Sequence, residues 1–134
     1  MFMRIVNILF FIAVAALGFF FVLPAFAGSK VTPEEAMKRL DTGNAVLIDV
    51  REPSEWSGGV VESAVLLSLS DLQKGGSGWT EFLRQHKDRE LVLYCRSGNR
   101  SGIAARILEK QGFHVSNAGA FSTWVQSGAP TRKP

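Results

Sequence analysis

The chain has 134 residues, of which 46% are hydrophobic and 20% are charged, and its formal net charge is +3. This composition suits one globular domain behind an apolar N-terminal segment and leaves no room in the chain for a second domain. No run rich in lysine or arginine is present, so the small positive surplus does not indicate a nucleic-acid partner.

The first 27 residues predict a cleavable secretory signal peptide. One positive charge near the start precedes an apolar stretch over residues 8–23, and Pro24 then leads into the small-residue pattern Ala25-Phe26-Ala27. That order is typical of a signal peptide with its cleavage site. The alternative is an uncleaved membrane anchor, because the apolar stretch approaches the ~20 residues that span a bilayer. In both cases we expect residues 28–134 to form an exported, periplasmic domain.

The folded part begins with a predicted helix. Thr32 is suited to the N-cap, Pro33 to the first helical position, and Glu35 completes a capping-box spacing. Gly43-Asn44 ends this helix. The short apolar run Ala45–Val50, rich in β-branched residues, then predicts a buried strand.

The middle of the chain predicts two more strands and a helix. A turn-rich loop over residues 51–59 precedes a strand at Ser63–Leu69. The glycine-rich break Lys74–Gly78 separates it from a helix over Trp79–His86. A third apolar strand follows at Glu90–Cys95.

The last third predicts a helix from Arg100 to Gly112, a short strand at Phe113–Asn117, and a helical turn or two within residues 120–128. Strands and helices alternate throughout. This alternation predicts an α/β fold with a mostly parallel sheet and helices on both faces. Ligands of such folds bind at the carboxyl ends of the strands, where Cys95 ends one strand and Asp49–Glu52 end another.

Cys95 is the only cysteine of the chain, so it cannot form an internal disulfide. It is therefore inert, paired with another molecule, or a reactive free thiol. No Cys-x-x-Cys motif is present, which argues against a self-contained thiol-disulfide oxidoreductase. The histidines, His86 and His114, are far apart in sequence, and we expect neither a metal site nor a cofactor.

The residues after Cys95 favour a reactive thiol at the mouth of a loop. A helix N-terminus follows closely, Arg96 and Arg100 add positive charge, and Gly98 permits a turn whose N–H groups point inward. Each of these features stabilises a thiolate. The alternative is a buried, inert residue at the end of a strand. The glycine, the two arginines and the helix N-terminus together favour a reactive thiol over an inert one.

Loop length separates two families that place a cysteine in such a cradle. Cysteine-type protein phosphatases use Cys-x5-Arg, whereas this chain has Cys95-x4-Arg100 with Ser101 after it and Tyr94 before the cysteine. The stretch "CRSGNRS" instead resembles the active-site loop of rhodanese-like sulfurtransferases. Further similar stretches are "VTPEEA", "LIDVREPSEW" and "NAGAFSTWVQSGAP", so the resemblance covers residues 31–130.

The resemblance implies a three-layer rhodanese-like fold with a five-stranded sheet, and sulfur transfer through a persulfide on Cys95. Sulfane sulfur would pass from thiosulfate or a similar small anionic donor to cyanide, a thiol or another thiophilic acceptor. Arg96 and Arg100 would attract the donor and stabilise the departing sulfite. The backbone N–H groups of the loop would hold the persulfide; the substrate-binding residues are then Arg96, Ser97, Gly98, Asn99, Arg100 and Ser101.

Three further expectations follow. Asp49 and Arg51 support the site, either as a structural ion pair or by contacting substrate. The protein is a monomer or weak dimer, and it has a possible membrane tether if the signal stays uncleaved. The alternative function is a non-catalytic persulfide carrier that serves a partner protein.

One segment departs from the family pattern. Families of this kind usually continue with Gly-His-Ile-x-Gly-Ala, and this chain has Gly-Val-Val-Glu-Ser-Ala over residues 59–64. Val60 and Ser63 therefore replace the histidine and the second glycine. The change does not touch the sulfur-carrying residue, and we expect it to alter the neighbouring loop and with it the choice of donor.

Overall fold

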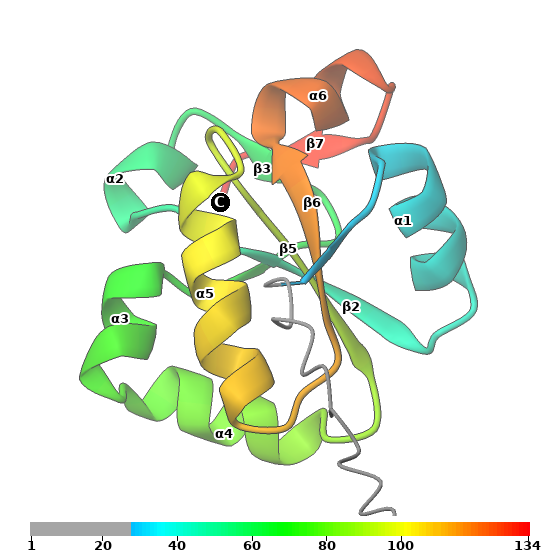
Figure 1. The fold of residues 1–134 in the computed structure, drawn as a ribbon. Helices are drawn as coiled ribbons and strands as arrows, with labels where there is room; N and C mark the ends of the chain where they lie inside the picture. The colour runs from blue at the N-terminus through cyan, green and yellow to red at the C-terminus, as the bar shows by residue number, and fades with distance from the viewer. Residues whose placement is uncertain (1–27) are drawn as a thin grey trace, which may run out of the picture.

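A parallel five-stranded sheet forms the centre of the computed structural model, which describes residues 28–134 (Figure 1). The strand order is β1-β6-β5-β2-β4, and every neighbouring pair in it is parallel. The strands are β1 (Ser29–Lys30), β2 (Ala45–Asp49), β4 (Val65–Leu66), β5 (Glu90–Cys95) and β6 (Val115–Ala120). The predicted α/β architecture is confirmed, whereas the signal peptide predicted for residues 1–27 lies outside the described residues.

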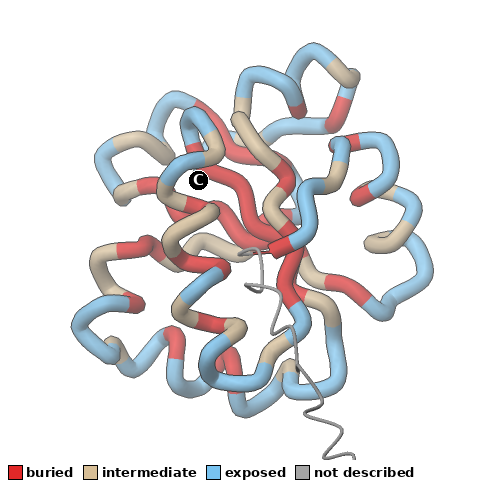
Figure 2. The backbone as a smooth tube through the Cα atoms, viewed as in Figure 1, coloured by how far each residue is buried: buried red, intermediate tan, exposed pale blue. Residues whose placement is uncertain are grey.

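The central strands are buried on both faces, as Figure 2 shows along the middle of the molecule. In β5, Leu91, Leu93 and Cys95 belong to one apolar cluster, while Val92 and Tyr94 belong to the other. Successive side chains of a strand point to opposite faces, so a strand with helices on both sides must be apolar throughout. This explains why its sequence reads as a continuous apolar run.

Helices cover both faces of the sheet and complete the three layers (Figure 1). One cluster packs β2 and β5 against the apolar side chains of three helices, α3 (Leu69–Lys74), α4 (Ser77–Gln85) and α5 (Asn99–Lys110). The other cluster contains Ala36 of α1 (Pro33–Asp41) and Trp124 of α6 (Phe121–Gln126). None of the helices within residues 28–134 is long and apolar enough to cross a bilayer.

A small antiparallel ladder lies beside the main sheet and was not predicted. It pairs β3 (Val60–Val61) with β7 (Thr131–Arg132). The Arg132 guanidinium also donates to the carbonyl oxygens of Glu62 and Ala64 at 2.9 and 3.0 Å. The ladder therefore ties the end of the chain to the segment that departs from the family pattern.

The predicted strand at Ser63–Leu69 is wrong over most of its length, since only Val65–Leu66 pairs with β2. Ser68 ends the strand because its hydroxyl accepts a hydrogen bond from the Asp71 N–H and caps α3. An N-capping serine inside an apolar run thus outweighed the β-propensity of its neighbours.

The loop predicted over residues 51–59 contains a short helix, α2 (Pro53–Trp56). The Glu55 side chain accepts from the Glu52 N–H at 2.9 Å, and the Glu55 N–H donates to the Glu52 carbonyl at 2.9 Å, so Glu55 caps the start of this helix. At α1 only half of the predicted capping box forms, with Thr32 accepting from the Glu35 N–H.

Candidate active site

Cys95 is the last residue of β5, and its side chain is fully buried. It packs in the same apolar cluster as Ile48, Val50 and Ala104. The thiol therefore lies beneath its loop as part of the core, and the expected position at the loop mouth is wrong. The reason is the strand register, which points Cys95 to the same face as Leu91 and Leu93.

Gly98 brings a backbone N–H onto the sulfur. It has φ +91° at the N-cap of α5, a left-handed conformation that favours glycine. Its N–H donates to Cys95 Sγ at 3.0 Å. A Cβ at this position would lie 3.4 Å from the Gly119 Cα, which is close to ordinary contact, so it is the left-handed conformation that requires glycine.

Neutral hydrogen-bond donors lower the pKa of Cys95. Burial raises the pKa of the thiol, but the Ser101 hydroxyl at 3.4 Å and the N–H groups of Ser101, Ser97 and Gly98 lower it further than burial raises it. The donors all belong to the turn and first turn of α5, where N–H groups lack helical partners. The loop thus stabilises a thiolate through its backbone and one hydroxyl.

Arg100 is paired with a carboxylate rather than directed at the sulfur. Its guanidinium donates to both Glu55 oxygens, at 2.6 and 2.8 Å, and so joins α5 to α2. This hydrogen bond from Arg100 lowers the pKa of Glu55 to about 2, although partial burial opposes it. Arg100 therefore fixes the loop against α2.

Asp49 and Arg51 form a buried ion pair at the end of β2. Arg51 Nε lies 3.0 Å from both Asp49 oxygens, and Arg51 Nη2 donates to Asp49 at 2.7 Å and to the Gly59 carbonyl at 2.7 Å. The guanidinium also stacks on the Phe121 ring, 4.3 Å from its centroid. Of the two roles left open by the sequence, the contacts are those of a structural brace.

Arg96 differs from the other two arginines. It is exposed, and within residues 28–134 it makes no ion pair. It lines an open pocket of about 430 Å³ together with Arg51, Glu55, Phe121 and Ser122. Arg96 follows Cys95, and Phe121 follows Ala120, which pairs with Cys95, so this pocket lies at the carboxyl end of β5. Cys95 itself does not line it.

Family comparison agrees with this geometry. The sequence profile of the rhodanese-like domain matches residues 32–127. The chain belongs to the rhodanese-like domain family. A sulfurtransferase from Allochromatium vinosum is 32% identical over 109 residues, which cover 79% of this chain and 96% of that protein. These findings support sulfur transfer as the general activity.

Two further relatives extend the comparison. The probable adenylyltransferase/sulfurtransferase MoeZ of Mycobacterium tuberculosis is 37% identical over 109 residues, and the match spans 79% of this chain but only 27% of that protein. A rhodanese-related protein from Thermoplasma volcanium has a crystal structure with a TM-score of 0.66 at 22% identity, covering 79% of this chain and 99% of that one. The latter supports the rhodanese-like fold.

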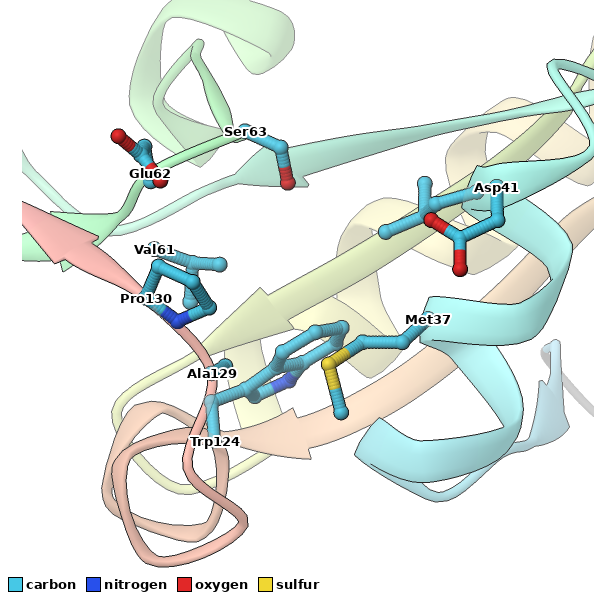
Figure 3. Close-up of a pocket in the computed structure, with 9 residues that line it drawn as sticks. Met37, Asp41, Val61, Glu62, Ser63, Trp124, Ala129 and Pro130 are labelled. Carbon is cyan, nitrogen blue, oxygen red and sulfur yellow. The ribbon is translucent and has the colours of Figure 1, made fainter.

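The departure from the usual rhodanese pattern lies at β3 and the residues after it. Val60 is buried in β3, while Ser63 is exposed and lines a separate pocket of about 340 Å³ (Figure 3). The lining residues of that pocket are Met37, Leu40, Asp41, Val61, Glu62, Ser63, Trp124, Ala129 and Pro130. None of them lines the pocket beside Arg96. The altered segment therefore shapes the α1 and α6 side of the molecule.

Three residues around the loop were missed by sequence reasoning: Glu55, Phe121 and Asn117. The capping-box spacing of Glu52 and Glu55 was a readable signal, although it does not identify Arg100 as a partner. Phe121 and Asn117 come from β6 and its end, and only the strand order places them beside the loop. Within residues 28–134 no cluster of three metal-ligating side chains occurs.

Proposed function

We propose that this protein is an exported rhodanese-type sulfurtransferase that carries sulfane sulfur on Cys95. The observation that carries the proposal is the convergence of the Gly98 N–H and the Ser101 hydroxyl on one buried sulfur whose pKa is lowered. A thiolate is the nucleophilic form of cysteine, and the same donors stabilise a persulfide anion.

The proposed cycle needs one thiol and no external oxidant. The Cys95 thiolate attacks the outer sulfur of thiosulfate, the S–S bond of the donor breaks, and sulfite leaves with the electron pair. Cyanide or a thiolate then attacks the outer persulfide sulfur, so thiocyanate or a new persulfide leaves and the Cys95 thiolate returns. The thiolate used in the first step is restored in the second and the transferred sulfur keeps its oxidation level, so a single cysteine is sufficient.

Arg96 is the residue best suited to attract the anionic donor. Its charge is exposed on the residue after Cys95, whereas Arg51 and Arg100 are each paired with a carboxylate. N–H groups that point at the position where negative charge develops lower the barrier of such a step. The periplasmic location remains part of the proposal and follows from the sequence of residues 1–27.

Intact-mass measurement after incubation with thiosulfate tests the proposal. The reduced protein should gain the mass of one sulfur atom, and cyanide should then remove it. Cys95→Ser should show neither change; its fold is checked by circular dichroism. A native protein that stays unmodified while fully reduced would contradict the proposed function. The same spectrum reports whether the first 27 residues are present.

The complete burial of Cys95 favours a second candidate, a carrier that delivers its sulfur only to a partner protein. A buried persulfide is protected until another surface opens the loop. Such a carrier would not produce thiocyanate from thiosulfate and cyanide without its partner. Steady-state thiocyanate production therefore separates the enzyme from the carrier.

A further inference from the structure

Asn117 connects β6 to both groups that hydrogen-bond the sulfur. Its Nδ2 donates to the Gly98 carbonyl at 2.9 Å, and its Oδ1 accepts from the Ser101 hydroxyl at 2.8 Å and from the Gly119 N–H at 3.1 Å. A carbonyl can only accept and an N–H can only donate, so Gly98 and Gly119 fix which end of the amide is oxygen. The orientation of Asn117 is therefore determined by its neighbours.

The Ser101 hydroxyl has one proton and two acceptors within reach. Asn117 Oδ1 lies at 2.8 Å and Cys95 Sγ at 3.4 Å. When Ser101 donates to the amide oxygen it cannot also donate to the sulfur. Ser101 is fully buried, so within the described chain these two atoms compete directly for its proton.

We propose that Asn117 is a positioning residue for sulfur transfer, which competes with Cys95 for the hydrogen bond of the Ser101 hydroxyl. The inference deepens the proposed function and rests on it for its consequence. When the thiol is neutral, the Ser101 hydroxyl donates its hydrogen bond to Asn117 Oδ1. When Cys95 is a thiolate, the Ser101 hydroxyl donates to the sulfur instead, because a charged acceptor forms the stronger hydrogen bond.

The exchange follows the charge through the reaction. In the persulfide the negative charge moves to the outer sulfur, and the inner Cys95 sulfur becomes a weak acceptor. The Ser101 proton then returns to Asn117 Oδ1, while the loop N–H groups hold the outer sulfur. Asn117 thus lets one hydroxyl stabilise the thiolate, turn away from the inner sulfur in the persulfide, and donate to it again as Cys95 leaves as a thiolate in the second step.

The charged groups around Cys95 set the background for this exchange. Arg100 faces it from α5 and is paired with Glu55 of α2, Arg96 extends from the loop, and the Asp49–Arg51 pair closes the end of β2. The residues of β6 from Val115 to Ala120 are uncharged. On the adjoining elements, Lys30 of β1 is in register with Asn117, and Arg106 of α5 lines a pocket with it. An aspartate at position 117 would therefore introduce a negative charge among positive neighbours.

Two substitutions at Asn117 should shift the ionisation of Cys95 in opposite directions. Asn117→Asp keeps the acceptor and adds charge, so it retains the Ser101 proton and raises the midpoint of thiolate formation by about one pH unit. Asn117→Leu removes the acceptor at similar volume, frees the proton for the sulfur and lowers the midpoint by about half a unit. The thiolate absorbance in the ultraviolet, followed against pH, measures both, and Cys95 is the only thiol present.

Combining each Asn117 variant with Ser101→Ala shows whether Asn117 acts on Cys95 through the Ser101 hydroxyl or only stabilises the loop. If Asn117 acts through Ser101, Asn117→Leu should no longer shift the midpoint of thiolate formation in the Ser101→Ala protein. Asn117→Asp should then shift it only through the repulsion between the new carboxylate and the thiolate. Upward shifts in both variants that persist in Ser101→Ala would overturn the proposal, since loss of a brace loosens the loop whatever Ser101 does. Thermal unfolding shows whether each variant is folded. No sulfur donor is used, so failure here is distinguishable from failure of the proposed sulfur transfer.

Discussion

The carboxyl ends of β2 and β5 are neighbours in the sheet, yet they treat charge in opposite ways. At the end of β2, Asp49 and Arg51 neutralise each other in a buried pair. At the end of β5, Cys95 receives hydrogen bonds from uncharged donors, the Gly98 N–H and the Ser101 hydroxyl. The charges at the end of β2 neutralise each other, whereas the end of β5 presents hydrogen-bond donors that stabilise a negative charge on Cys95.

The difference shows that arginines near a catalytic loop need not act on the substrate. Arg51 and Arg100 each make two-point contacts with a carboxylate, and Arg96 is the one arginine at this edge of the described sheet without an ion pair. Bidentate arginine pairs fix geometry as well as charge. Arg51 therefore braces the end of β2, and Arg100 holds the first turn of α5 against α2.

The largest expected effect comes from breaking the buried pair. Arg51→Met leaves the Asp49 carboxylate buried without its partner, and we expect the free energy of unfolding to fall by about 3–5 kcal/mol. Urea unfolding followed by fluorescence measures the loss. The double variant Asp49→Leu/Arg51→Met is the matched control, because it removes both charges and should lose less than the single variant.

A small loss in Arg51→Met would contradict the structural role of this pair. If stability stayed near that of the unmodified protein while the KM for thiosulfate rose, Arg51 would contact the donor instead. The comparison between the strand ends would then fail, since both ends would face the substrate.

The second effect concerns the one arginine without an ion pair. Arg96→Gln should raise the KM for thiosulfate about tenfold and weaken the salt dependence of kcat/KM, because an exposed cation attracts the dianionic donor through solvent. Arg84→Gln is a matched control, since Arg84 is exposed on α4 and paired only with Glu81. Steady-state rates at several ionic strengths provide the measurement.

Equal salt dependence in Arg96→Gln and in the unmodified protein would show that Arg96 does not attract the donor. A fall in kcat without a change in KM would instead place Arg96 on the departing sulfite. Either result would change which side of the loop the donor enters.

The fold was largely readable because its signals are local. The apolar run Glu90–Cys95 is a strand over the same residues in the structure, since a central parallel strand is buried on both faces. Two-residue strands such as β3 and β7 carry no periodic pattern. Their pairing depends on where the end of the chain returns, which no local pattern predicts.

The site was readable only in part. Gly98 and Ser101 could be inferred from the short loop, because a turn into a helix N-terminus points N–H groups inward. The pairing of Arg100 with Glu55 joins residues 45 positions apart in sequence. Asn117 reaches the loop only because β6 lies beside β5. Contacts of this kind depend on how distant segments are placed in the fold. The sequence of the loop alone therefore predicted that Arg100 acts on the substrate, because its partner Glu55 is not part of the loop.

The smallest expected effect is an acid-dependent loss of stability from the Glu55–Arg100 pair. Hydrogen bonding to Arg100 lowers the pKa of Glu55 from 4.5 to about 2 in the folded protein. A carboxyl whose pKa is lowered by folding stabilises the fold above its unfolded pKa, and this contribution is lost as the pH falls from 4.5 towards 2. The pair is partly exposed, so we expect about 1 kcal/mol.

Glu55→Gln should therefore cost stability near neutral pH and little in acid. Urea midpoints of the two proteins should converge as the pH falls, because protonated Glu55 and glutamine are both neutral. Glu81→Gln, which removes a fully exposed partner of Arg84, serves as the control and should change the acid dependence less. A constant difference between Glu55→Gln and the unmodified protein across this range would mean that the charge of Glu55 does not brace the loop. Because glutamine can still accept from the Glu52 N–H, that difference would come from altered side-chain geometry, and Arg100 would be free to act on the sulfur donor.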